Sequence, residues 1–170
     1  MRGELLAACA LAVVAATLAP AVATAATSRA SVDVDGGGLS ADGPVAMEMP
    51  SVRLTGQAVT VEAPVGPFQV MDTRPASPGW TLVAVASRPQ DARGVAMAAP
   101  LVISPRLPAA PGGSGLVLGP EGPLDAPRAI LTAPQGTGTG LVQVAPMLRL
   151  TVPRDAPSGS YTATLVVTVS

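Results

Sequence analysis

Proline and glycine interrupt this 170-residue chain so often that a helix has little room to form. The sequence contains 19 prolines and 18 glycines, and few uninterrupted stretches reach the roughly 12 residues that a stable helix needs. Between these interruptions apolar and polar side chains alternate, which is the pattern of a β-strand with one buried face. The chain is therefore predicted to be an all-β protein.

Segments with this alternation follow one another at short intervals. The clearest two are residues 147–152 and 161–169, and the loop Arg154–Gly159 between them predicts a terminal β-hairpin. Many short strands bounded by glycine and proline are typical of an antiparallel β-sandwich with Greek-key, immunoglobulin-like connections. Further strands are predicted at residues 45–49, 51–55, 58–63, 67–71, 80–86 and 141–145.

Residues 104–140 depart from the alternation, because prolines and glycines crowd this segment. A loop of this length is uncommon inside a compact domain. It is either a surface excursion that carries function or a mobile insert. Residues 115–118 and 128–132 are candidates for short strands that hold it to the domain.

The N-terminus has the pattern of a secretory signal peptide. Arg2 precedes an apolar stretch from Leu5 to Ala19, and small residues follow it where signal peptidase cuts. A membrane anchor would need about 20 apolar residues, and Pro20 ends the stretch too early. We expect cleavage after Ala23, Ala25 or Ala26.

The predicted organisation is a signal-peptide helix at 1–26, a flexible lead at 27–44 and one β-sandwich domain at 45–170. The lead contains a candidate short strand at Ser31–Asp35. Cys9 is the only cysteine and lies in the signal peptide, so the mature chain can form no internal disulfide. The expected location is extracellular.

Histidine, lysine and asparagine do not occur in this sequence. Their absence excludes Ser-His-Asp and Ser-Lys nucleophiles, Schiff bases, histidine metal sites and the lysine of a phosphate loop. The 10 basic and 11 acidic residues nearly balance, so the chain lacks the basic surface that nucleic acid or anionic lipid requires. We expect no cofactor, no metal ion, no nucleic-acid partner and no membrane partner after cleavage.

Paired carboxylates are the catalytic device that this composition still allows, since a glycosidase needs two of them about 5–9 Å apart. No spacing between the acidic residues brings two together, and three aromatic rings can hardly line a sugar-cleaving cleft. We therefore expect no enzyme. The glycine run 136–140 lacks the lysine and helix of a phosphate loop and is interpreted as a flexible return into the next strand. The candidate carboxylates are Glu48, Glu62, Asp72, Asp91 and Glu121.

Trp80 is the only tryptophan, and it begins a predicted strand directly after Pro78-Gly79. A single tryptophan in a β-sandwich is most often a core residue, because the ring buries a large area. Asp72 and Arg74 can be explained as a turn pair whose surface ion bridge contributes about 0–1 kcal/mol. A contact surface would need these residues together, and the sequence leaves core and surface open for Trp80.

The segment from Phe68 to Leu82 resembles the proximal motif of the WxL cell-surface domain, in which an Asp-x-Arg turn leads through glycine into Trp-x-Leu. Residues 150–165 are similar to the closing hairpin of that family, so the resemblance covers most of 45–170. The second Trp-x-Leu of the family is replaced here by Val167-Thr168-Val169. The matching residues are Asp72, Arg74, Gly79, Trp80 and Leu82.

The resemblance implies a non-catalytic module that associates non-covalently with the Gram-positive cell wall, with peptidoglycan or another wall polymer as partner. It also implies that the five matching residues lie near the contact surface. The alternative is a structural or interaction subunit of a surface complex or appendage. Such a subunit would pair with other secreted proteins through an edge strand, such as the C-terminal one.

Overall fold

The computed structural model describes residues 36–108 and 115–170, and there the chain contains eleven antiparallel strands in three sheets. This confirms the predicted all-β sandwich class. The predicted signal peptide and the candidate strand Ser31–Asp35 lie outside the described residues. No helix in the described part of the chain is long and apolar enough to cross a bilayer.

Two of the sheets run into one another and form the first layer. The chain passes directly from β2 into β3 and from β9 into β10, and the Val65 amide donates to the Pro146 carbonyl at 2.9 Å where the sheets meet. The strand orders are β1-β3-β9 and β2-β10-β5-β7. The strands are β1 (Leu39–Asp42), β2 (Val59–Pro64), β3 (Phe68–Asp72), β5 (Val102–Ser104), β7 (Gly122–Pro123), β9 (Gly140–Val144) and β10 (Met147–Val152).

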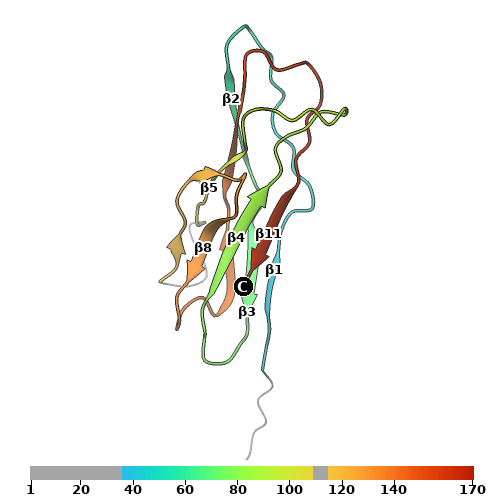
Figure 1. Cartoon of the computed structure of the whole chain (residues 1–170). Coiled ribbons are helices and arrows are strands. Elements are labelled where there is room, and N and C mark those ends of the chain that lie inside the picture. Colours follow the sequence, from blue (N-terminus) through green and yellow to red (C-terminus); the bar gives the residue numbers. More distant parts are fainter. Residues whose placement is uncertain (1–35, 109–114) are drawn as a thin grey trace, which may run out of the picture. The chain divides into compact units, whose positions relative to one another are not determined.

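The third sheet forms the second layer, in the order β11-β4-β8-β6 (Figure 1). Its central strand β4 alternates strictly, and its even-numbered residues from Trp80 to Ala86 are buried. This is the burial pattern expected of a strand that covers one face of a core. The strands are β4 (Trp80–Ala86), β6 (Val117–Leu118), β8 (Arg128–Ala133) and β11 (Leu165–Val169).

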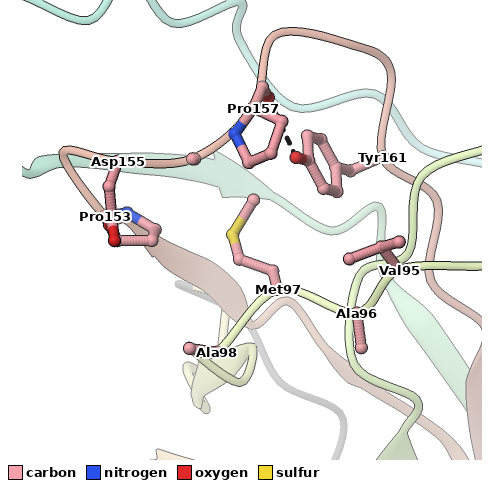
Figure 2. A pocket seen from close by; sticks show the side chains of 9 residues that line it. Val95, Ala96, Met97, Ala98, Pro153, Asp155, Pro157 and Tyr161 are labelled. Carbon is pink, nitrogen blue, oxygen red and sulfur yellow. Dashed lines mark hydrogen bonds between the residues drawn. The ribbon is translucent and has the colours of Figure 1, made fainter.

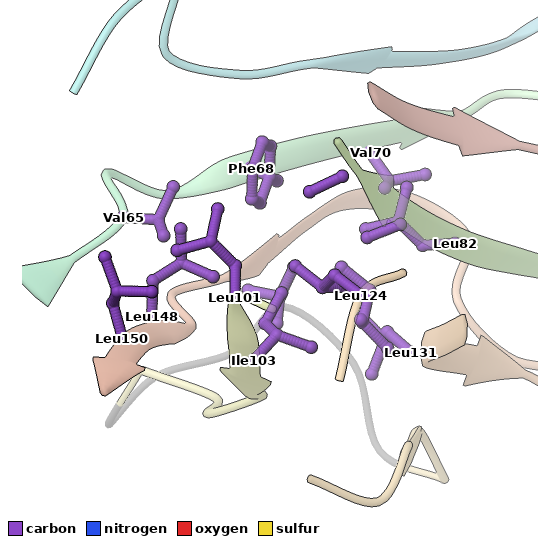
Figure 3. Close-up of a cluster of buried hydrophobic side chains, with 14 of the residues drawn as sticks. Val65, Phe68, Val70, Leu82, Leu101, Ile103, Leu124, Leu131, Leu148 and Leu150 are labelled. Atoms are coloured by element: carbon purple, nitrogen blue, oxygen red, sulfur yellow. The ribbon is translucent and has the colours of Figure 1, made fainter. Parts of the chain in front are cut away.

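A mostly aliphatic core fills the space between the layers, as Figure 3 shows for part of it. Val70 and Val142 face each other across the β3–β9 ladder, and Leu82 faces Leu131 across the β4–β8 ladder. All four side chains are fully buried. Phe68 adds a buried ring.

Segment 45–55 does not form the two strands predicted at 45–49 and 51–55. Met47, Met49, Val52 and Leu54 pack partly against the core, but the segment belongs to no sheet. Its alternation changes phase at Pro50, which has no N–H to donate to a ladder. Strand β1 instead lies at 39–42, inside the predicted flexible lead.

The long Pro/Gly-rich segment 104–140 is not one continuous loop. It supplies β7 to the first layer and β6 and β8 to the second. The candidate strands at 115–118 and 128–132 correspond to β6 and β8. Its glycines and prolines mark the short turns between these strands.

The predicted terminal hairpin is wrong. β10 pairs with β2 on one side and β5 on the other, so no position beside it remains for the last strand. β11 pairs with β4 in the second layer, and the connection from Pro153 to Thr164 crosses between the layers. Along this connection Thr162 and Gln90 exchange two backbone hydrogen bonds of 2.8 Å as an isolated bridge, and β11 begins at Leu165, later than the predicted residue 161.

The two flanks of the sandwich are built differently. On one flank Leu124 joins the layers, because its N–H donates to Leu101 and its carbonyl accepts from Ala86, both at 2.8 Å. On the other flank β1 and β11 lie side by side (Figure 1). No hydrogen bond between β1 and β11 occurs among the described residues.

Candidate functional site

The Asp-x-Arg turn at the end of β3 forms a closed ion pair. Arg74 donates to Asp72 through Nε at 2.9 Å and through Nη2 at 3.0 Å, and its backbone N–H donates to the same carboxylate at 3.0 Å. The Asp72 side chain is fully buried, and that of Arg74 is 27% exposed. This two-point geometry is the strong form of an arginine–carboxylate contact.

The same guanidinium fixes the start of β4. Its Nη2 also donates to the Gly79 carbonyl at 2.7 Å, so Arg74 connects the end of β3 to the residue before Trp80. Gly79 has a φ of 83°, a conformation that residues with a Cβ rarely adopt. A Cβ there would lie 2.6 Å from the Ala133 carbonyl oxygen, so glycine is required twice over.

Trp80 lies in the core with 3% of its surface exposed. Its indole N–H donates to the Gly138 carbonyl at 3.0 Å, which satisfies the only polar group of the ring. A Cβ on Gly138 would lie 2.4 Å from the Ala133 Cβ and 2.8 Å from the indole nitrogen. The glycine run 136–140 therefore closes over the tryptophan.

The charges of this cluster are locked by their hydrogen bonds. The Arg74 side-chain bonds hold the pKa of Asp72 below its usual range, and this effect outweighs the burial that would raise it. The same bonds raise the pKa of Arg74. The pair therefore stays ionised at every physiological pH, which suits a structural role and not proton transfer.

The structure brings four of the five matching residues into one network, with Asp72, Arg74, Gly79 and Trp80 linked as described. Leu82 lies two residues further along β4 and is fully buried. Of the two alternatives for Trp80, the structure shows the core position. Only Arg74 presents part of its side chain to solvent, and its guanidinium already binds two partners.

The other candidate carboxylates are partly paired. Arg149 on β10 donates to Glu62 and lies 2.8 Å from Glu121, so these two carboxylates converge on one arginine. Asp91 binds Arg93 at 2.8 Å, in a second Asp-x-Arg turn. The Arg93 bonds lower the pKa of Asp91. Neither arrangement leaves two free carboxylates facing an open cleft.

A groove of about 910 Å³ lies along β10, away from Trp80 and the other four matching residues. It is lined by residues of β2 and β10, by the segment 47–54 and by the loop 156–163. Its apolar lining includes Met47, Met49 and Met97.

Tyr161 lines both this groove and a smaller cavity of about 150 Å³, as do Met97, Ala156 and Pro157. Its hydroxyl donates to the Pro157 carbonyl at 2.9 Å, and Figure 2 shows the Met97 side chain directed toward these two residues. Methionine side chains are flexible and fit varied ligand shapes. None of the five matching residues lines the groove or the cavity.

Sequence reasoning missed Gly138 and the groove. The glycine run was a visible signal, but nothing in it indicated contact with a ring 58 positions away. The apolar residues of 45–55 are visible in the sequence, but their alternation predicts two strands and not a groove. Comparison with known proteins adds no assignment, because no family model matches the chain and no curated protein matches it significantly.

Proposed function

We propose that the chain is a secreted, non-catalytic cell-surface module that associates non-covalently with the Gram-positive cell wall through peptidoglycan. The observation that carries this proposal is the network of Asp72, Arg74, Gly79 and Trp80. Four of the five residues that carry the WxL resemblance are joined in this network, and the fifth, Leu82, is buried two residues further along β4. Their close contact supports the resemblance, from which wall association follows.

In this proposal the network has a structural role inside the domain and does not form the contact surface. Trp80 and Leu82 are buried, and Asp72 is enclosed by Arg74. The proposal therefore places the wall contact in the methionine-lined groove. There Tyr161 offers a partly exposed ring, and Glu48 and Arg53 offer polar groups beside the apolar lining.

A pull-down on purified peptidoglycan tests this proposal. Wild-type protein should sediment with the polymer, and Met49→Glu should weaken retention by about tenfold or more, because it adds a charge inside the groove. Val45→Glu is the matched control, since Val45 is fully exposed in the same segment and does not line the groove. A wild-type chain that stays in the supernatant would remove wall binding.

A structural observation favours a second candidate function, an interaction subunit that pairs through an edge strand. β11 lies at the edge of the second layer, and Val166 on it is 50% exposed. An exposed apolar edge strand is a template for pairing with another chain. This candidate predicts co-purification with another secreted surface protein or self-association of the chain.

A further inference from the structure

Half of the backbone groups of β11 point away from its sheet. In an antiparallel ladder, alternate residues bond to the same neighbour. Thr81 and Ser170 exchange N–H···O bonds of 2.8 and 3.1 Å, so the even-numbered residues of β11 face β4. Leu165, Val167 and Val169 therefore direct their N–H and C=O groups outward, where they bond to no described residue.

Three other edge strands of the sandwich, β2, β6 and β7, carry features that prevent pairing. The Val65–Pro146 bond sets the phase of β2, so that Glu62 and Pro64 lie at its outward positions. A charge and a missing N–H are two common ways to protect an edge. β7 and β6 are only two residues long, and β7 contains Pro123.

β11 has none of these features. Its sequence, Leu165-Val-Val-Thr-Val169, contains no charge, no proline and no glycine, and four of its five residues are β-branched. Such residues favour a strand within a sheet. β1 lies beside it but belongs to the other layer and pairs with β3. The open edge of β11 is therefore shaped to receive another strand.

We propose that β11 pairs with β11 of a second copy of this chain, antiparallel and about a two-fold axis at Val167. In this register Leu165 lies opposite Val169 of the second copy, and each outward N–H meets a C=O. On the outer face Val166 lies opposite Thr168, so no charges meet. The two second layers become one continuous sheet. The strand is complementary to itself, which is what a two-fold interface requires.

This inference rests on the second candidate function, edge-strand pairing, and on no part of wall binding. A chain that binds peptidoglycan as a monomer would overturn the self-pairing and leave the wall proposal standing. A dimer that ignores peptidoglycan would do the reverse. The two outcomes are therefore separate.

Val167→Pro tests the pairing. Proline removes an outward N–H and leaves the bonds of Val166 and Thr168 to β4 in place, a position that edge strands tolerate. Sedimentation over a range of concentrations should show a wild-type dimer and a Val167→Pro monomer with an unchanged far-ultraviolet spectrum. Thr60→Pro is the matched control, because it removes an outward N–H from the protected edge of β2, and it should stay dimeric.

Cysteine cross-linking tests the register without relying on the proline variant. Residues 166 and 168 form non-hydrogen-bonded pairs across the proposed axis, where Cβ atoms approach within disulfide reach. Mixing Val166→Cys protein with Thr168→Cys protein should give mixed disulfides far in excess of either homodimer. Predominant Val166→Cys homodimers would overturn the register.

Three further results would overturn the pairing itself. The first is a wild-type chain that stays monomeric at every concentration. The second is slow hydrogen exchange at Leu165, Val167 and Val169 in a monomer, which would show that the edge is covered within one chain. The third is a dimer that Val167→Pro does not weaken.

Discussion

Asp72 and Asp91 show that the same Asp-x-Arg pattern has different roles, depending on how exposed its arginine is. Both carboxylates accept hydrogen bonds from the backbone N–H and from the guanidinium of the arginine two positions later. Arg74 is 27% exposed and is held by a further carbonyl, whereas Arg93 is 72% exposed. The first pair therefore organises the β3–β4 connection, and the second shapes a surface turn.

Asp72→Asn should lower the free energy of unfolding by about 1–3 kcal/mol, because an amide turns an N–H group toward a partly buried guanidinium. Asp91→Asn, the matched control at the pair whose arginine is 72% exposed, should cost less. Urea unfolding at pH 7 measures both. Equal losses would contradict a special role for the Asp72 pair.

The same pair predicts a pH dependence. The native pKa of Asp72 is lowered relative to the unfolded chain, so its stabilisation is complete above the unfolded value of about 3.9. It is lost as the pH falls through the lower native pKa. Unfolding free energies measured from pH 6 downward should fall less steeply below about pH 4 in Asp72→Asn than in wild type. Parallel acid limbs would contradict this.

At the scale of elements, alternation predicted strands well and their partners poorly. β4 matches the predicted residues 80–86, since its period is uninterrupted. The prediction of a terminal hairpin is wrong because alternation shows which face of a strand is buried but not which strand it pairs with. The strands predicted in segment 45–55 are wrong because Pro50 has no N–H to donate to a β-ladder. The alternation of polar and apolar residues does not show this loss. Of the candidate site, the sequence indicated the cluster but not the tertiary contact with Gly138.

The β3–β4 connection depends on a glycine, and Gly79→Ala should show it. A positive φ alone costs a residue with a Cβ about 1–2 kcal/mol. Gly56→Ala is the matched control, because Gly56 has a φ of 86° with no atom near its Cβ position. Gly79→Ala should lose more stability in urea unfolding than this control, since its Cβ meets the Ala133 carbonyl. Equal losses would show that the loop moves aside freely.

At the scale of the whole molecule, most pairings join segments far apart in sequence, as in the ladders β2–β10 and β4–β11. Loop closure must precede such contacts, so sandwiches fold slowly for their size. The fold class could be predicted from the sequence because proline and glycine interrupt the described part of the chain too often for a helix. The layer assignment could not, because it depends on which long-range pairs close.

Trp80 provides a reporter of this folding, since it is the only tryptophan and lies in the core. On dilution from urea its emission should return to shorter wavelength in milliseconds to seconds, the range of β-sandwiches. The equilibrium transition seen by this emission should coincide with that seen by far-ultraviolet circular dichroism. Emission that changes at lower urea than the β-sheet signal would show that the cluster unfolds separately.

The unequal flanks of the sandwich decide where the native state opens. Backbone bonds through Leu124 must break to separate the layers on one flank, whereas only side-chain packing holds β1 against β11 on the other. We therefore expect transient local unfolding to begin beside β11, so that water and proteases enter there first. Any strand that occupied this flank would suppress that fluctuation, so association and resistance to proteolysis should rise together.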